Sequence, residues 1–436
     1  MDTSVERRTM RKLTVRLVYF AAVLFFFNYI DRVNIGFAAL QMNQDLGFTA
    51  TVYGFGAGVF FLSYALFEVP SNLILHRVGP RLWLARIMIT WGIISACFAL
   101  ITTETTFYIL RFLLGLAEAG FVPGIVLYFT YWIPEKYRGK MFAGFFGAAL
   151  LSSIIGAPLS GWILSSFSGV SGLSGWQWMF IIEGVPSVIL GIVILLILVD
   201  RPEDAKWLAD DERKWLLSRL EEDRKASPAT AHGTVMDFLR DRRVLALTAI
   251  YFFYAVSVYG VTFWLPLIIK SFGGLSTIEI GFLTSIPYLC AFIFMQFVAQ
   301  NSDRTGERKW HVALCALLGS AGLVMSALAG SPTMAFICLC IAAMGIWGQN
   351  GVFWTLPTSY LKGTAAAGGI AFINSVAQFG GFLGPYAVGW VKDTTGSFTV
   401  PLIILGCSSL MVTIIASNMR LNAGVRPAGM PDRKLA

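Results

Sequence analysis

Twelve long apolar segments dominate the chain of 436 residues, and charged stretches separate them. A helix that crosses a bilayer needs about 20 mostly apolar residues, and each segment is long enough. Helices satisfy all their own backbone hydrogen bonds in lipid, so we expect an all-α membrane protein. The expected spans lie near residues 17–40, 52–75, 82–102, 106–132, 140–166, 177–199, 244–269, 277–299, 310–330, 333–357, 364–391 and 398–419.

Composition excludes several other classes of protein. Of all residues, 56% are hydrophobic and only 13% are charged, whereas about 25% are charged in an ordinary soluble domain. The six Cys lie in apolar runs without a C-x-x-C pair, and the three His lie in or beside charged loops. We therefore expect neither a disulfide framework nor a metal site. No phosphate-binding Walker loop is present, so ATP-driven transport is not indicated and no cofactor is expected.

The distribution of basic residues predicts the orientation in the membrane. All but four of the 33 Lys and Arg fall before the first span, after the last span or in alternate loops. By the positive-inside rule, both termini and the long middle loop are cytoplasmic. This arrangement explains the net charge of +8 without a nucleic-acid partner. The first apolar run lacks a small-residue cleavage site, so we interpret it as a membrane helix and not as a removable signal.

The middle loop divides the chain into two halves. Residues 200–243 contain 10 basic and 11 acidic residues, with Trp and Leu interspersed. This pattern predicts a linker that includes an amphipathic helix on the cytoplasmic face, and we interpret it as solvated and without chemistry. The predicted domains are a six-helix half over 1–199, the linker over 200–243, and a six-helix half with a short tail over 244–436.

A short loop motif occurs once in each half. Residues 76–81 (HRVGPR) follow the second span, and residues 303–308 (DRTGER) follow the eighth, with the first Arg and the Gly repeated after 227 residues. Two halves in the same orientation indicate a parallel repeat, for which a site at the midplane between the halves is typical. We expect the loop groups to form cytoplasmic contacts that act as a gate, namely Arg77, Arg81, Asp303, Arg304 and Arg308.

Several stretches of the sequence resemble a known protein family. The twelve spans, the long loop and the repeated loop motif are similar to the major facilitator superfamily, although the first loop copy has His76 where Asp is usual. Further stretches resemble its anion:cation symporter branch: residues 28–35 (NYIDRVNI), 68–72 (EVPSN), 111–119 (RFLLGLAEA), 176–184 (WQWMFIIEG), 200–208 (DRPEDAKWL) and 363–367 (GTAAA). The resemblance implies a permease for acids of the galactonate, glucarate, tartrate or phthalate type in a bacterial inner membrane.

Four ionisable residues lie deep within the first and fourth spans: Asp31, Arg32, Arg111 and Glu118. Each costs at least about 2.5–3.5 kcal/mol at the bilayer centre, so these side chains should face a cavity or one another. Arg111 and Glu118 are about 10 Å apart along the helix, and neighbours such as Asp31 and Arg32 point about 100° apart, so neither couple forms a simple pair. Salt bridges that only fix the two spans together are the structural alternative to a functional site.

The functional hypothesis assigns a role to each of these residues. The planar guanidinium of Arg32 can hold a carboxylate through two hydrogen bonds. Desolvation favours the neutral forms of Asp31 and Glu118, so we expect both to bind protons. Once protonated, Glu118 no longer competes with the substrate anion for positive charge, and proton and anion bind together. The resemblance also implies protons on the matching acids and substrate on the matching Arg. Arg111 is assigned as an electrostatic partner or gate.

Several uncharged polar and aromatic residues complete the expected substrate site. Asn28 extends the polar stripe of the first span, and the resemblance suggests that Tyr64 contacts a substrate hydroxyl. In the second half, Asn374 and Gln378 share a helix face, and Trp354 could line a cavity. Packing roles are the alternative for each of them.

Two further acids fall within expected spans but receive a structural interpretation. Glu68 and Glu183 are placed near helix ends, where water or loop backbone could reach them. We therefore do not include either acid in the expected site.

Taken together, these features predict a secondary active transporter that imports an organic carboxylate by proton symport with alternating access. An organic-anion exchanger and a sodium-coupled importer are alternatives of the same fold, and a transporter-like receptor is a third. An enzyme is not expected, because no nucleophile–base or metal constellation is present. The expected partners are a carboxylate, a proton and membrane lipid, with a monomer as the expected state. The identity of the carboxylate, the stoichiometry and the direction of transport stay open.

Overall fold

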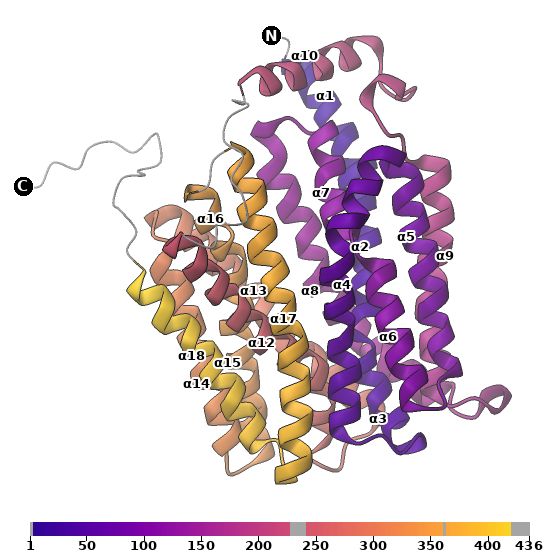
Figure 1. Cartoon of the computed structure of the whole chain (residues 1–436), viewed down its shortest axis with the longest axis vertical. Helices are drawn as coiled ribbons and strands as arrows, with labels where there is room; N and C mark the ends of the chain where they lie inside the picture. Colours follow the sequence, from indigo (N-terminus) through magenta and orange to yellow (C-terminus); the bar gives the residue numbers. More distant parts are fainter. Residues whose placement is uncertain (1–2, 227–240, 361–362, 420–436) are drawn as a thin grey trace, which may run out of the picture. The chain divides into compact units, whose positions relative to one another are not determined.

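The computed structural model describes residues 3–226, 241–360 and 363–419, and Figure 1 shows that long helices make up most of these ranges. No strand occurs within these ranges. The predicted all-α fold class is therefore confirmed. Eleven helical segments of the described chain are long and apolar enough to span a membrane, and the expected span at 364–391 falls within one further helix, Gly363–Thr395.

The first part of the chain is continuous from α1 to α10. Its helices are α1 (Thr3–Leu13), α2 (Tyr19–Val33), α3 (Ile35–Asp45), α4 (Ala50–Val78), α5 (Pro80–Cys97), α6 (Glu104–Glu118), α7 (Phe121–Trp132), α8 (Glu135–Ser166), α9 (Gly175–Ile197) and α10 (Asp210–Ala226). A π-helical turn at Thr14–Val18 joins α1 to α2, so the first expected span starts within one long helical segment.

The later part contains the remaining long helices. They are α12 (Arg242–Lys270), α13 (Thr277–Thr305), α14 (Lys309–Leu328), α15 (Pro332–Phe353), the short α16 (Thr355–Tyr360), α17 (Gly363–Thr395) and α18 (Thr399–Asn418).

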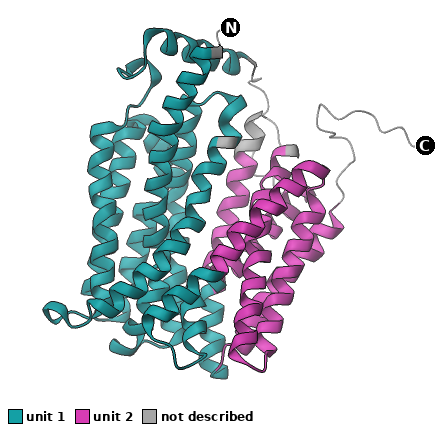
Figure 2. Ribbon diagram, turned by 180° about the vertical axis from the view of Figure 1, so that it is seen from behind, with its two compact units in different colours: residues 1–228, 261–286, 385–396 teal, residues 229–260, 287–384, 397–436 magenta. Residues whose placement is uncertain are grey.

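The chain forms two compact units, coloured separately in Figure 2. The first contains Met1–Pro228 together with Val261–Ile286 and Pro385–Gly396, and the second contains the rest. The first unit therefore includes parts of α12, α13 and α17 in addition to α1–α10. The domain boundaries expected at residues 199 and 243 stay a prediction.

The fourth span is interrupted directly after a buried charged residue, whereas the first span is not. In the first span the backbone stays helical at Asn34 (φ −58°, ψ −25°), where α2 passes into α3 two residues after Arg32. The fourth span breaks at Ala119 and Gly120, immediately after Glu118. Gly120 has φ +89°, a left-handed conformation, and a Cβ there would collide with the Ser71 hydroxyl. The break after Glu118 therefore requires glycine at this position.

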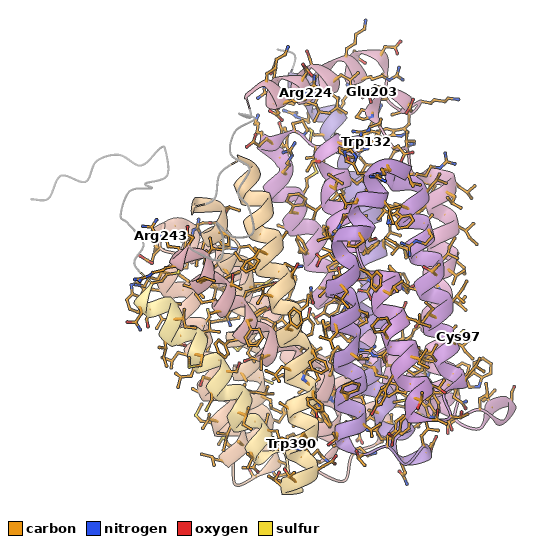
Figure 3. All side chains as sticks on the ribbon, viewed as in Figure 1. Cys97, Trp132, Glu203, Arg224, Arg243 and Trp390 are labelled. Atoms are coloured by element: carbon orange, nitrogen blue, oxygen red, sulfur yellow. The ribbon has the colours of Figure 1, made fainter. Side chains whose placement is uncertain are left out.

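The amphipathic helix expected in the linker is α10, and it packs against α1 within the first unit. Arg8 and Lys12 of α1 form ion pairs with Asp211 and Glu212 at 2.7 and 2.6 Å. Trp132, labelled in Figure 3, stacks on Trp207 with ring centroids 5.6 Å apart. Acidic residues at the start of α10 thus match basic residues of α1, and the interpretation of residues 200–243 as a solvated linker without chemistry stays a prediction.

Candidate functional site

The centre of the first unit contains a buried ion pair between α2 and α6. The guanidinium of Arg32 donates a hydrogen bond to the Glu118 carboxylate. Only 7% of Arg32 and 1% of Glu118 is exposed. The hypothesis that charged side chains of the first and fourth spans lie together holds for this pair, since both occupy one buried site.

Aromatic rings of α4 border the Arg32 side of the pair. The guanidinium carbon lies 5.2 Å from the centre of the Phe60 ring and 5.3 Å from that of Tyr64. Tyr64 is 3% exposed. These rings orient a planar cation, which Lys could not replace with the same geometry. Tyr64 therefore lies beside the expected carboxylate-binding group, and its contact with a substrate hydroxyl stays a prediction.

Tight packing of α6 on α4 sets the position of Glu118. A Cβ at Gly115 would collide with the Phe60 carbonyl oxygen, and a Cβ at Gly56 would collide with the Phe107 ring. Small residues at these positions let the two helices approach closely, as is common in membrane bundles. The same approach brings Phe60 of α4 beside both Arg32 and Arg111.

Arg111 lies on the same helix as Glu118 but in a different environment. Its Nε donates to the carbonyl of Gly56 at 3.1 Å, and its Nη2 donates to that of Ala57 at 3.0 Å. The Phe60 ring lies 5.2 Å from its guanidinium carbon. Within the described residues Arg111 forms no ion pair, and its assignment as an electrostatic partner or gate stays a prediction. Its contacts fasten α6 to α4.

Asp31 is not part of the Arg32 and Glu118 pair. Its carboxylate accepts hydrogen bonds from Trp91 Nε1 and Ser95 Oγ of α5, both at 2.9 Å, and from Ser187 Oγ of α9 at 2.7 Å. The adjacent positions on α2 direct the two side chains to different faces, as expected from helical geometry. Asp31 therefore does not share a single pocket with Arg32 and Glu118 in this structure.

A second buried acid lies in the same region as Asp31. Glu183 is 3% exposed and accepts a hydrogen bond from Ser160 of α8 at 2.7 Å. It is the ninth residue of α9, so its placement near a helix end was wrong. Glu68 is also buried, at 9% exposure. Neighbouring helices cover both acids, which the order of residues in one span cannot reveal.

Asn28 is fully buried on α2. Neither its nitrogen nor its oxygen has a hydrogen-bond partner within the described chain. A buried amide without partners is costly, so this group is available to a ligand or to water. No group of three His, Cys, Asp or Glu in the described ranges is arranged to hold a metal ion.

The remaining expected substrate contacts belong to the second unit. Trp354 follows α15 and packs with its ring centroid 4.7 Å from that of Tyr251. Asn374 and Gln378 are partly exposed positions of α17. The role of these three residues at the Arg32 site stays a prediction.

The expected gate loops make contacts within their own units. Arg81 donates from Nε to the Leu195 carbonyl at 2.9 Å, and its backbone N–H donates to Asp200 at 2.8 Å. Arg308 forms an ion pair with Asp303 at 2.7 Å. Arg77 and Arg304 are exposed. The role of these loops as a gate stays a prediction.

A second set of contacts in the first unit was not expected from the sequence. Asp393 accepts hydrogen bonds from the backbone N–H of Ala50 at 3.1 Å and of Thr51 at 2.7 Å, and from the Thr51 hydroxyl at 2.6 Å. The Tyr53 hydroxyl donates to the Phe263 carbonyl at 2.7 Å. These contacts join α4 to α17 and α12. Residues more than 200 apart form them, and no local pattern signals such pairs.

Comparison with known proteins agrees with this architecture. The family model of the Major Facilitator Superfamily matches residues 21–385, and the chain belongs to that family. A protein of Agrobacterium vitis named "Putative tartrate transporter" is 51% identical over 420 residues, which cover 95% of this chain and 93% of the relative. The "Quinolone resistance transporter" of Acinetobacter baumannii is 40% identical and covers 94% of this chain and 94% of its own length.

A solved structure shows the same fold. The xylose transporter XylE from E. coli, in a partially occluded inward-open conformation, aligns with a TM-score of 0.73 at 14% identity. The alignment covers 94% of this chain and 99% of XylE. The protein is thus a multi-pass bacterial membrane transporter and not an enzyme.

Proposed function

We propose that the protein is a secondary active transporter that imports an organic carboxylate together with a proton, by alternating access. The ion pair between Arg32 and Glu118 is the observation on which the proposal depends. A carboxylate is the natural ligand of a guanidinium bordered by aromatic rings, and here Glu118 occupies that position. A substrate acid would have to displace it.

Displacement of Glu118 couples the substrate to a proton. An ionised Glu118 competes with the substrate for Arg32, whereas a protonated Glu118 has no charge and releases the guanidinium. The substrate anion then takes the place of the Glu118 carboxylate, and the site stays electrically balanced with one proton and one carboxylate added. Asp31 is proposed as a second proton-binding residue that acts from the neighbouring α5–α9 interface.

Hydroxy acids are the proposed class of substrate. The Agrobacterium vitis relative, whose name refers to tartrate, supports this choice. Buried groups such as Tyr64 and Asn28 offer hydrogen bonds to hydroxyl groups next to a carboxylate. Asn374, Gln378 and Trp354 are proposed as further substrate contacts.

Uptake into proteoliposomes tests the proposal. Purified protein is reconstituted, and accumulation of labelled tartrate is measured with an inward proton gradient, a sodium gradient or neither. We expect accumulation with the proton gradient alone, together with alkalinisation of a weakly buffered external medium. Accumulation that requires sodium, or one-for-one exchange without a pH change, would instead support the alternative transporters of this fold.

A competition experiment tests the substrate class. Unlabelled tartrate, galactonate, phthalate and a quinolone are each added to the uptake assay. Inhibition by the hydroxy acids is the expected result. Inhibition by the quinolone alone would contradict a carboxylate importer and favour a drug transporter, in line with the name of the Acinetobacter baumannii relative.

A further inference from the structure

Two buried acids, Asp31 and Glu183, lie close together between α2, α5, α8 and α9. Asp31 is 1% and Glu183 3% exposed. Ser187, which donates to the Asp31 carboxylate at 2.7 Å, lies four residues after Glu183 on α9. Among the described residues, neither carboxyl forms an ion pair with Arg, Lys or His, whereas Arg32 pairs with Glu118. This acid pair is therefore distinct from the Arg32 and Glu118 ion pair.

The two carboxyls have unequal sets of hydrogen-bond donors. Asp31 accepts three hydrogen bonds, from Trp91, Ser95 and Ser187, and the Trp91 indole can only donate. Such a set stabilises a charged carboxylate. The serine hydroxyls can also rotate and accept, so the same site accommodates a protonated Asp31. The environment of Asp31 thus suits both states.

Glu183 has fewer hydrogen-bond donors than Asp31. Ser160 donates to its Oε1 at 2.7 Å, whereas Oε2 has no hydrogen-bond partner within the described residues. The side-chain amide of Asn34 at the end of α2, three residues after Asp31, is also buried, and neither its nitrogen nor its oxygen has a hydrogen-bond partner among the described residues. A proton on Oε2 would give Glu183 a donor for the amide oxygen of Asn34, and so supply the missing bond.

Close helix packing excludes water from this region. A Cβ at Gly92 would lie 2.8 Å from the Gly184 carbonyl oxygen, and a Cβ at Gly184 would lie 2.9 Å from that of Gly92. The backbones of α5 and α9 are therefore in contact beside the acid pair. Ser187 lies one turn after Glu183 on α9, so the two polar groups share the face that α2 covers.

Two neighbouring carboxylates without a cation cannot both ionise at low cost in such a place. A buried, unpaired charge is expensive, and a second like charge nearby adds repulsion. When two acids share a site, their different environments decide which one keeps the proton. Here the donors favour charge on Asp31 and a proton on Glu183.

We propose that Glu183 is a positioning residue that stays a neutral carboxylic acid while its neighbour Asp31 gains and loses a proton. The proton of Glu183 bonds to the amide oxygen of Asn34 and holds the junction of α2 and α3 against α9, two residues after Arg32. Its neutrality leaves Asp31 as the only charge of the cluster. That Asp31 exchanges a transported proton rests on the proposed function, whereas the protonation of Glu183 does not.

Infrared spectroscopy tests the protonation directly. Purified wild-type protein and the Glu183→Gln variant are compared at neutral pH for the carbonyl stretch of protonated carboxylic acids. We expect the variant to lose one such band, and the exposed control variant Glu279→Gln to keep it. An unchanged spectrum in Glu183→Gln would show that Glu183 is ionised and would overturn the proposal, whatever the protein transports.

Counterflow with equal pH on both sides tests the role of this proton. Raising the pH should reduce wild-type exchange when Glu183 ionises, because the carboxylate no longer donates to the amide oxygen of Asn34 and its charge repels that of Asp31. Gln cannot ionise. The Glu183→Gln variant should therefore keep its exchange activity at neutral pH, and its exchange should no longer fall at alkaline pH through ionisation of residue 183. An inactive variant with native thermal stability, or an alkaline decline identical to the wild type, would contradict a neutral positioning role.

Discussion

Arg32 of α2 and Glu118 of α6, 86 residues apart in the sequence, form a buried ion pair whose guanidinium is bordered by Phe60 and Tyr64. In this conformation the Glu118 carboxylate occupies the guanidinium of Arg32. A substrate carboxylate and the Glu118 carboxylate are alternative ligands of one cation, and this competition leads to the first two predictions.

Arg32→Lys should weaken tartrate binding although it keeps the positive charge. The ammonium group cannot reproduce the planar fork beside the two rings, and a charged hydrogen bond contributes about 1.5–3 kcal/mol, or roughly tenfold or more in affinity. Ligand-induced thermal stabilisation of the purified protein measures the effect, with exposed Arg77→Lys as the matched control. Equal stabilisation of Arg32→Lys and the wild type would remove Arg32 from the binding site.

Glu118→Gln should separate binding from energy coupling. The neutral amide leaves Arg32 free at every pH, so tartrate affinity should stay high where wild-type affinity falls with rising pH. Calorimetric titration over a pH series measures this difference. Proteoliposomes of the variant should exchange tartrate but fail to accumulate it under a proton gradient. Full gradient-driven accumulation by Glu118→Gln would rule out Glu118 as the coupling acid.

Gly120→Ala should destabilise the protein, because the left-handed conformation costs roughly 1–2 kcal/mol for a residue with a Cβ. The new methyl group would also collide with the Ser71 hydroxyl, which accepts a hydrogen bond from Trp83 at 3.0 Å. The matched control is Gly147→Ala, in a helical position where a Cβ meets nothing within 4 Å. Thermal unfolding should show a lower transition for Gly120→Ala only. An equal transition in both variants would mean that the break is not rigid.

Asp393→Asn should loosen the contact between α17 and the start of α4. The variant loses the charge and one of the two oxygens that accept from Ala50 and Thr51, and charged hydrogen bonds contribute about 1.5–3 kcal/mol. Thermal unfolding of the purified variant measures this loss, with exposed Glu203→Gln as the control. A transition as high as that of the wild type would show that Asp393 does not stabilise this contact.

The Asp393 contact should also be insensitive to pH in the neutral range. Burial raises the pKa of Asp393, but hydrogen bonds from Thr51 and Ala50 outweigh burial and hold that pKa below its ordinary value. A lowered pKa means that the stabilisation is complete above the ordinary value and is lost only as the pH falls through the lowered one. The difference between wild type and Asp393→Asn should therefore stay constant from weakly acidic to weakly alkaline pH.

Local sequence properties predicted the fold and the identity of the central charges. Span length and apolarity depend on neighbouring residues, so the all-α class followed directly. The cost of burying charge singled out Asp31, Arg32, Arg111 and Glu118 without any knowledge of their partners. Helical geometry also indicated that Asp31 and Arg32 face different directions.

The hydrogen-bond partners of these charged residues could not be predicted from the sequence. Ser95, Ser187 and Trp91 are ordinary residues of membrane helices, and only the packing of α5 and α9 makes them donors to Asp31. Glu183 was judged by its distance from the end of a span, but its burial depends on α2 and α8, which cover that face of α9. Asp393 lies just beyond the end of the expected span and resembles any acid in such a place until its contact with Thr51 is known.

The first turn of α4 has an unusual dependence on a distant helix. Thr49 accepts from the Val52 N–H, but the amides of Ala50 and Thr51 are satisfied by Asp393 of α17. If α17 moves away from α4, these amides lose their acceptor and must find another. Water is the acceptor that can replace Asp393 at once. Separation of α17 from α4 therefore requires that water hydrates the first turn of α4.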